Sequence, residues 1–434
     1  MLKCKRWAVS VSTWNAILAI TGGTLLSISE LALPSRADDY SKVSNDQSSP
    51  YRLGLQYLAQ PIANPAGGTI NEFSWLNGLW LQIELGRGLN LDKDQWNEID
   101  HWVLKLETAA VRGNSGYYRQ IGATYPLQSM TSSGQWLSEL TIRREAGEGG
   151  VSMKTGIFSL NPGFMENEAF NFYIHSAIND TFNNEVLGIP IAPLTSLGMQ
   201  WTIGNQSHAR SHQLRVGAFT VVPSNTFGQS VQPGTRPLNL QGAVGLLQWQ
   251  YGLENGDISK TELISIRNKI VEDQLPKPGI MIGGYWSQTS SQRIALKRQA
   301  RLPQGLNRGL YGTATIDIPP SIWRGVRARA WIAGQYGFDW HNNPAPTFYG
   351  AGLLLQGLLP NRPLDVTGIG GASTGFSPFI NPGQDRESLL EINHQIQISQ
   401  ALSLKPFAQL ILTPSGISGK PPILATGIQA SIRF

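Results

Sequence analysis

The end of the chain constrains its fold most, because apolar and polar side chains alternate there up to the last residue. The apolar set is Leu424, Thr426, Ile428, Ala430, Ile432 and Phe434, with small or polar residues between. A period of two places the two sets on opposite faces of a β-strand. Terminal residues usually fray unless a sheet holds them. The pattern therefore predicts the closing strand of a transmembrane β-barrel, with Ile428, Ile432 and Phe434 towards lipid and a polar lumen inside.

The composition favours many short strands over helices. Hydrophobic residues make up 41% of the 434 residues and charged residues only 15%, with 47 Gly, 26 Pro and 13 Trp. Glycine and proline punctuate strands with turns, and so low a share of charged side chains is unusual for a soluble surface. In a barrel the outward positions are apolar without any long apolar run. The fold class predicted is all-β, a transmembrane antiparallel β-barrel of about 16 strands with long outer loops.

The first residues have the order of a secretory signal peptide. A basic start precedes an apolar stretch around residues 16–26 and a small-residue exit at residues 35–37. The apolar stretch falls short of the roughly 20 residues that a spanning helix needs. Residues 1–37 are therefore predicted to be removed on export. They carry a net charge of +3, so removing them from the whole chain's +5 leaves +2, and no nucleic-acid partner is indicated. The single cysteine, Cys4, lies in this leader.

The remaining chain is divided into a polar lead-in, residues 38–65, and a barrel domain, residues 66–434. The lead-in is rich in Ser, Asp, Asn and Gln, whereas strand-like alternation begins after it. Three connections look longer than turns: 159–196, 257–278 and 358–388. Connections this long are usually functional, and one of them can fold inward to narrow the lumen. Within them, residues 170–174 suggest a short structured piece and residues 260–273 a short helix.

Seven polar or aromatic residues are candidates for the lumen, because they alternate with outward apolar residues. They are Arg143, Arg215, Arg327, Arg329, Trp331, Glu107 and Glu139. Fixed donors and acceptors suit a lumen that passes neutral polyols, and an aromatic face such as Trp331 suits a sugar ring. The alternative is that the arginines only neutralise lumen carboxylates and stiffen the barrel. A one-residue slip would turn an arginine to lipid, at a cost of roughly 2–4 kcal/mol at the midplane.

Five tryptophans share the apolar faces of their strands and are predicted to form an interface girdle. They are Trp102, Trp136, Trp201, Trp249 and Trp286. An indole suits a site that is apolar at one end and wet at the other. Packing in the core of a soluble sandwich is the alternative.

Signals for an enzyme are poor. His208 and His212 are four residues apart, but they lie in a turn-like segment without a helix to align them. The glycines at 368–371 lack the strand and helix of a dinucleotide-binding loop. No catalytic residue, metal site or cofactor is predicted.

Several segments in order resemble the carbohydrate-selective porins of the OprB type, from about Asn64 to Phe434. The segments are residues 64–68 and 89–94, Leu214 to Phe219, Pro278 to Tyr285, Gly309 to Tyr311, Arg327 to Ala330, Gly357 to Asp365, Gly368 to Gly370, Glu387 to Gln400, Leu404 to Gln409, Thr413 to Gly416 and terminal Phe434. His394 and Leu410 stand where the family commonly has tyrosine. No surface-layer-homology module is evident.

The resemblance implies a sixteen-stranded barrel in the outer membrane of a Gram-negative-type envelope, often a homotrimer. Its partners would be outer-membrane lipid and small polar solutes, foremost sugars, which cross by facilitated diffusion. Two other functions stay open. One is a weakly selective channel for ions and nutrients without a sugar site. The other is an exported soluble β-sandwich that binds a ligand.

Overall fold

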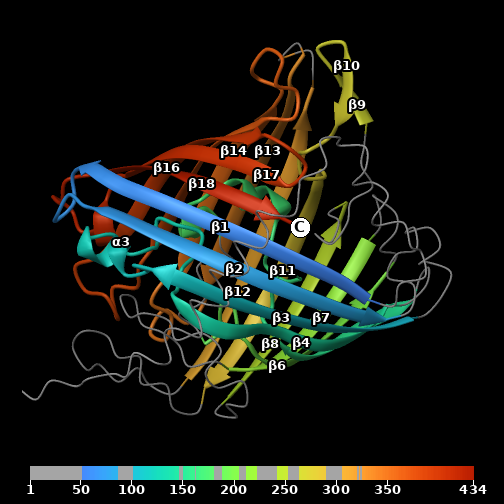
Figure 1. The fold of residues 1–434 in the computed structure, drawn as a ribbon. Coiled ribbons are helices and arrows are strands. Elements are labelled where there is room, and N and C mark those ends of the chain that lie inside the picture. The colour runs from blue at the N-terminus through green and yellow to red at the C-terminus, as the bar shows by residue number, and fades with distance from the viewer. Residues whose placement is uncertain are drawn as a thin grey trace, which may run out of the picture. The chain divides into compact units, whose positions relative to one another are not determined.

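The structure, a computed structural model, describes residues 51–86, 101–145, 150–161, 163–179, 188–204, 212–221, 242–252, 263–289, 305–319, 322 and 325–434. Sixteen antiparallel strands close into one barrel in which neighbours along the chain are neighbours in the sheet (Figure 1). The strands are β1 (Tyr51–Ala66), β2 (Phe73–Gly86), β3 (His101–Gly113), β4 (Gly134–Glu145), β5 (Val151–Phe158), β6 (Ser196–Ile203), β7 (His212–Thr220), β8 (Gly242–Tyr251), β11 (Gly279–Thr289), β12 (Gly305–Ile318), β13 (Arg327–Gly337), β14 (Thr347–Gln356), β15 (Val366–Gly375), β16 (Arg386–Gln397), β17 (Leu402–Ile411) and β18 (Ile423–Arg433). The predicted fold class is confirmed.

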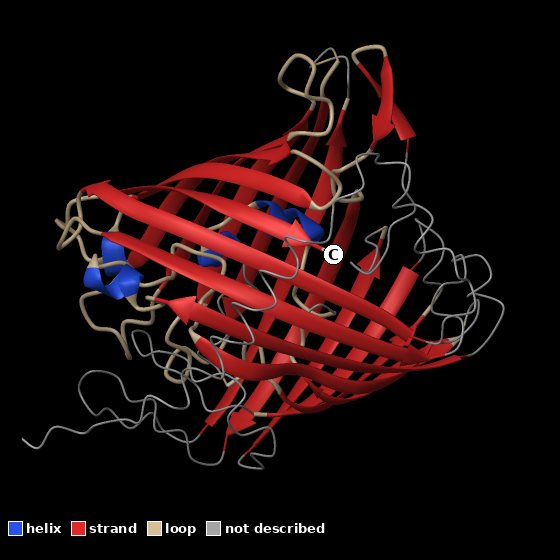
Figure 2. Ribbon diagram, in the orientation of Figure 1, coloured by secondary structure: helices blue, strands red, loops and turns tan. Residues whose placement is uncertain are grey.

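In the described part of the chain, helices occur only as short pieces (Figure 2). They are α3 (Tyr117–Gln120), η2 (Glu168–Phe172), α4 (Ser176–Asn179) and η4 (Pro414–Gly416). None of the described helices is long and apolar enough to cross a membrane. The short structured piece expected at 170–174 is present as η2. The helix expected at 260–273 is wrong where the structure describes it, because β9 (Leu263–Ile266) and β10 (Lys269–Glu272) form a separate hairpin there.

The seam of the barrel joins the first strand to the last. Strand β18 pairs with β1 on one edge and with β17 on the other. Phe434 closes the pairing, since its N–H donates to Leu55 O at 2.9 Å and its carbonyl accepts from Leu55 N at 3.1 Å. The predicted closing strand is therefore present. We call the end of the barrel where β1 begins and β18 ends the terminal end, and the opposite end the loop end.

The barrel begins before the predicted boundary at residue 66. Strand β1 covers residues 51–66, and residues 51–65 were assigned to the polar lead-in, so that assignment is wrong for this segment. Its polar residues include Arg52 and Gln60, which point inward, while Tyr51 and Leu53 are exposed on the outer face. A lumen-lining strand is polar at every second position, which is why the segment reads as a linker. Residues 1–50 lie outside the described part of the chain.

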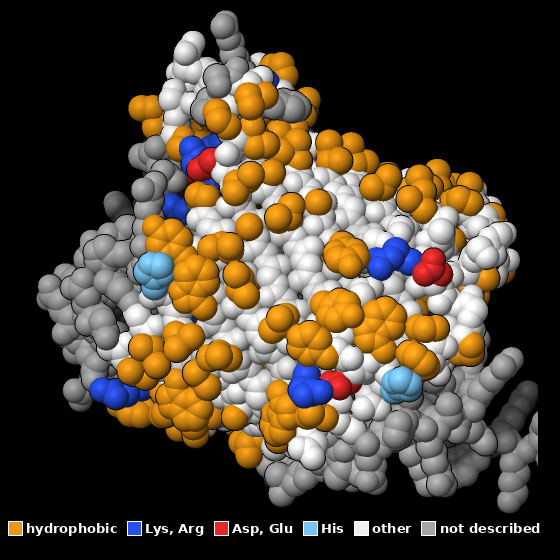
Figure 3. All heavy atoms as spheres, turned by 180° about the vertical axis from the view of Figure 1, so that it is seen from behind, with side chains coloured by type: hydrophobic (Ala, Val, Ile, Leu, Met, Phe, Trp, Pro, Cys, Tyr) orange, Lys and Arg blue, Asp and Glu red, His pale blue; other side chains and the backbone are white. Residues whose placement is uncertain are grey.

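The outer wall is apolar. Figure 3 shows hydrophobic side chains spread over one side of the barrel, with few charged side chains among them. Alternate residues of single strands make up this surface, such as Leu390 and Ile392 of β16 or Ile428 of β18, and Phe434 is 73% exposed. So large an apolar surface around a closed barrel is what contact with lipid requires. The arrangement does not fit a soluble sandwich, whose apolar faces pack against each other.

Four of the five predicted girdle tryptophans lie on outward faces. Trp102 and Trp286 are exposed, and Trp201 and Trp249 alternate with inward neighbours on β6 and β8. On the outer face His212 stacks on Trp249, with ring centroids 5.7 Å apart. Their role at the membrane interface stays a prediction.

Trp136 faces the opposite way to the prediction. Strand β4 has a bulge, because Glu139 pairs with Glu107 but Leu137 already pairs with Thr108. The extra residue, Ser138, shifts the register by one and so moves Trp136 opposite Ala109 on the inner face. There it packs against the buried cluster that contains Met130. Trp136 is therefore a lumen-side residue.

Candidate functional site

The connection between β5 and β6 folds into the barrel, and we call residues 159–195 the inward loop. Its first half is fastened to the wall by side-chain amides. Gln248 donates to Gly163 O at 3.1 Å and accepts from Met165 N at 2.9 Å. The Asn167 amide donates to Thr313 and Thr315, both at 2.8 Å. The expectation that one long connection folds inward is confirmed for this one.

Residues 171–175 of the inward loop are held by a buried carboxylate and a buried amine. Glu391 on β16 accepts hydrogen bonds from Ile174 N at 2.8 Å and His175 N at 2.7 Å. Lys405 on β17 donates to the carbonyls of Asn171 and Phe172 at 3.3 and 3.2 Å. Hydrogen bonds to ionised groups are stronger than neutral ones. The loop is therefore attached to the wall at several points between residues 163 and 175.

Trp331 is covered by the inward loop. Its Nε1 donates to the Tyr173 hydroxyl at 3.0 Å, and the Phe170 ring lies edge-on with a centroid distance of 5.3 Å. The side chain is 1% exposed. Trp331 does face inward, as the alternation predicts, but it cannot offer a ring face to a solute. That part of the prediction is wrong, and the residue instead packs the loop to the wall.

A second connection, residues 114–133 between β3 and β4, also lies inside the barrel. Glu387 on β16 accepts from Thr124 N at 2.9 Å and Tyr125 N at 3.3 Å. Pro126 O accepts from Ser176 N of the inward loop at 3.0 Å. The two loops therefore contact each other inside the barrel, and both are bonded to β16. This segment was not predicted to fold inward, because it is shorter than each of the three connections that stood out in the sequence.

Tyr117 ties the second loop to the rim near the start of β2. Its hydroxyl donates 2.7 Å to Asn64 Oδ1 and lies 2.9 Å from Glu72 O. Burial raises the pKa of Tyr117 to about 12, so the hydroxyl stays a donor at any physiological pH. It begins the short helix α3.

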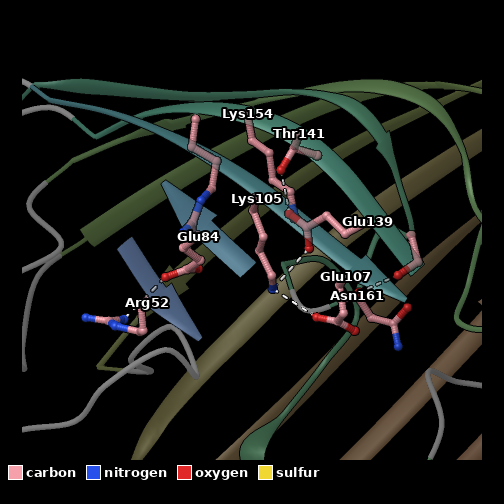
Figure 4. Close-up of polar contacts among 10 residues, drawn as sticks. Arg52, Glu84, Lys105, Glu107, Glu139, Thr141, Lys154 and Asn161 are labelled. Atoms are coloured by element: carbon pink, nitrogen blue, oxygen red, sulfur yellow. Dashed lines mark hydrogen bonds and ion pairs between the residues drawn. The ribbon is translucent and has the colours of Figure 1, made fainter. Parts of the chain in front are cut away.

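Strands β2 to β5 carry a chain of opposite charges on the inner face (Figure 4). Lys105 lies between two carboxylates, 3.2 Å from Glu107 and 3.2 Å from Glu139. Glu139 also pairs with Lys154 at 2.8 Å. Among these, the Glu107 side chain keeps the largest exposed fraction, 23%. Cross-strand pairs of opposite charge stabilise neighbouring strands.

The chain of charges continues towards the terminal end. Glu84 pairs with Arg143 at 2.8 Å and with Arg52 at 3.4 Å, and the Arg52 side chain is 37% exposed. We call the following seven residues the charged wall: Arg52, Glu84, Lys105, Glu107, Glu139, Arg143 and Lys154. Three of them, Arg143, Glu107 and Glu139, were predicted to line the lumen, and the structure brings these three together. The other four lie on the polar faces of their strands, and alternation alone could not single them out.

The remaining predicted arginines point inward; Arg215 and Arg329 are buried, whereas the Arg327 side chain is 24% exposed. Arg215 is 3% exposed, and its guanidinium donates to Gly163 O of the inward loop. Arg329 is fully buried, 2.8 Å from Asp317 and 3.4 Å from Asp273. Arg327 pairs with the same Asp273 at 3.0 Å. For these three, the contacts favour the alternative in which arginines neutralise carboxylates or hold backbone in place.

Neither a metal centre nor paired histidines emerge from the described residues. No group of three or more His, Cys, Asp or Glu in this part of the chain is placed to hold a metal ion. His208 lies outside the described residues, and His212 is on the outer face.

A closed barrel with an apolar exterior, a polar inner wall and inward loops defines a channel of the porin class. Comparison with known proteins agrees. Residues 90–434 match the model of the "Carbohydrate-selective porin, OprB family". A search of curated proteins returned no significant match.

Solved structures show the same fold. The high-pH structure of Pseudomonas putida OprB is 16% identical, with a TM-score of 0.68 over 91% of this chain and 97% of that one. The low-pH structure of the same protein is 13% identical with a TM-score of 0.51 over 93% and 98%. Salmonella typhi OmpF, in complex with daunomycin, is 9% identical with a TM-score of 0.51 over 90% and 99%.

The chain belongs to the carbohydrate-selective porin family of the OprB type. It is an outer-membrane channel that allows carbohydrates and other small polar solutes to diffuse passively.

Proposed function

We propose that solutes pass between the charged wall on one side and the inward loop and the loop at residues 114–133 on the other. We further propose that this passage favours neutral polyols over ions. The support comes from the order of the charges. Every side chain of the wall lies within 3.4 Å of a partner of opposite sign. Four cations face three carboxylates, so their long-range fields largely cancel. A passing ion meets a small net potential.

Paired charges still present hydrogen-bonding atoms to a solute. A carboxylate offers about four lone-pair sites and an ammonium three N–H donors, and each pair uses only part of them. A sugar hydroxyl both donates and accepts, so it can replace water at either partner. The partial exposure of Arg52 and Glu107 supports contact with the solute at these two positions. The observation that carries the proposal is this alternation of sign along one inner wall.

Single-channel recording in planar bilayers tests the proposal. Sugar added to the wild-type channel is expected to reduce the ion current, because a bound polyol obstructs the gap. Glu107→Gln keeps the shape of the side chain but removes its charge, and we expect it to weaken the block by sugar and to raise the preference for anions.

Arg308→Gln is the matched control. Arg308 lies outside the lumen and pairs with Asp339 at 3.1 Å, so removing its charge should leave both readouts unchanged. If Glu107→Gln and Arg52→Gln alter neither sugar block nor ion selectivity, the charged wall is not the solute path.

The second candidate is a general pore without a sugar site. It is favoured by the burial of Trp331, which leaves that ring unable to stack on a sugar. In that case sugars would enter without reducing the wild-type current beyond the effect of solution viscosity.

Two further expectations belong to the same proposal. We propose export with removal of residues 1–37, and N-terminal sequencing of the envelope protein should find a start at Asp38.

We also propose assembly as a homotrimer. The mass of the detergent-solubilised protein tests it, since a monomer would give one third of the expected protein mass.

A further inference from the structure

Exposed aromatic side chains lie on the outer face of the barrel, at the loop end of strands β11 to β14. They are Trp286, Tyr336, Phe338 and Tyr349. Tyr336 packs on Phe338 and lies near Trp340, with centroid distances of 5.9 and 6.3 Å. Aromatic belts mark the depth of lipid headgroups in outer-membrane barrels. Side chains at this level of the outer wall therefore meet headgroups and not acyl chains.

Arg386 lies in this zone on the outer face. It is the first residue of β16 and shares the face of Leu390 and Ile392, which are exposed. Its guanidinium carbon lies 5.1 Å from the centre of the exposed Tyr349 ring. An arginine is tolerated far better near the lipid headgroups, at the end of a strand, than at the bilayer midplane.

The guanidinium is held flat against the wall by neutral groups only. Nη1 donates to Ser373 O at 3.1 Å and Ser373 Oγ at 3.2 Å, and Nη2 donates to Thr347 Oγ1 at 3.0 Å. Ser373 Oγ is in turn 2.7 Å from Ser388 Oγ. Within the described ranges no carboxylate forms an ion pair with Arg386. The positive charge is positioned by neutral groups on three strands, β14, β15 and β16.

Arg308, at the same end of the barrel, shows the contrast. It opposes Trp286 in the β11–β12 pairing, so it shares the outer face. One edge of its guanidinium donates two hydrogen bonds to the Asp339 carboxylate, from Nε at 3.2 Å and from Nη2 at 3.1 Å. Of these two outward arginines, Arg308 has a carboxylate partner and Arg386 has none among the described residues.

We propose that Arg386, with Tyr349 and the hydroxyls of Thr347, Ser373 and Ser388, binds the phosphate of a membrane lipid headgroup. The chemistry is that of a guanidinium and nearby O–H donors around an oxyanion, in which charge-assisted bonds are strong. The exposed Tyr349 ring beneath the guanidinium holds its plane in place. Two lipids supply such a group, a glycerophospholipid and lipopolysaccharide. The site is independent of the solute path, since it lies on the other side of the wall.

Native mass spectrometry of the full-length mature protein in detergent tests the proposal. The probes are phosphatidylglycerol, lipopolysaccharide and lipopolysaccharide from which the phosphates have been removed. Arg386→Gln is expected to bind the phosphate-bearing lipid about fivefold more weakly, the effect of one basic residue near a membrane surface. Arg386→Lys keeps the positive charge but loses the planar, two-pronged guanidinium. Its affinity for the lipid should lie between those of the wild type and Arg386→Gln. Arg308→Gln should bind as the wild type does.

Folding is checked by the shift in gel mobility on heating, and Arg386→Lys serves if Arg386→Gln does not fold. If only the binding of phosphatidylglycerol depends on Arg386, the site is assigned to a glycerophospholipid. If the binding of lipopolysaccharide depends on Arg386, and only when its phosphates are present, the site is assigned to lipopolysaccharide of the outer leaflet. Equal binding of all probes by wild type and both Arg386 variants overturns the proposal.

Discussion

His175 lies fully buried in the inward loop, where its Nδ1 accepts a hydrogen bond from Ala177 N at 3.1 Å. The backbone N–H of His175 donates to the Glu391 carboxylate, so the residue lies at the point where the loop contacts the wall. Burial disfavours the charged ring and lowers the pKa of His175 to about 3. The attached loop therefore holds a neutral imidazole, whereas a detached loop would titrate near the ordinary value of about 6.5.

The first prediction is that acid loosens the inward loop through His175. Above about pH 6.5 both states are neutral and nothing changes. As the pH falls from 6.5 towards 3, His175 becomes protonated in the detached loop but stays neutral in the attached loop. The detached state is therefore favoured and attachment weakens. Single-channel conductance should rise and become noisier over this range. His175→Asn keeps an acceptor for Ala177 N but does not titrate, so its response should be smaller. An identical pH response in the two proteins would contradict the assignment.

The second prediction concerns Glu391. Glu391→Leu leaves the N–H groups of Ile174 and His175 buried without an acceptor, at about 1–3 kcal/mol each. We expect the loop to leave the wall and the conductance to increase. Glu391→Gln retains one carbonyl acceptor and should have an intermediate effect. Ile392→Leu, on the outer face of the same strand, controls for general damage to β16. Unchanged conductance in Glu391→Leu would show that the loop is held by its other contacts.

At the scale of the element, alternation predicted the faces of regular strands well. On β13 and β18 the polar or inward set and the exposed set fall as the period of two requires. It failed at β4, because a bulge at Ser138 reverses the faces on either side and bulges have no reliable mark in one sequence. The roles of Arg215 and Trp331 could not be predicted either, since both depend on a loop that covers them.

The inward loop itself could be predicted only as a long connection. Its direction depends on partners far away in the chain: Glu391 is 217 positions from Ile174. Alternation shows that Glu391 points inward, but not which backbone it meets. The loop at 114–133 depends on Glu387 in the same way, at a separation of 263 positions from Thr124.

The third prediction tests the bulge with cysteine reporters. The whole chain has one cysteine, Cys4, in the predicted leader. Trp136→Cys should react with a water-soluble maleimide reagent, because the thiol faces the lumen. Leu140→Cys should not react in a bilayer, since Leu140 is exposed on the outer face. A reversed pattern would mean that β4 keeps a regular register without the bulge.

At the scale of the whole molecule, the correction to β1 changes which part of the chain the barrel needs. A chain without residues 1–50 retains all sixteen strands. A chain without residues 1–66 lacks β1, so β2 and β18 would each present an unpaired edge to lipid. An unsatisfied backbone group in the bilayer costs several kcal/mol.

The fourth prediction follows from this difference. Refolded into detergent, the chain lacking residues 1–50 should show the gel mobility shift on heating of a closed barrel and form channels. The chain lacking residues 1–66 should do neither. Equal folding of both would place the start of the barrel at residue 66 after all.

The pairing of β1 with β18 also sets an order of events in biogenesis. The partner of the first strand to emerge from the ribosome is the last strand made, so the wall cannot be sealed while synthesis or transport is in progress. Until then the nascent sheet has two open edges that would pair with any neighbour. We therefore expect closure of the barrel to follow the delivery of β18, and the two open edges to need protection from other chains until then.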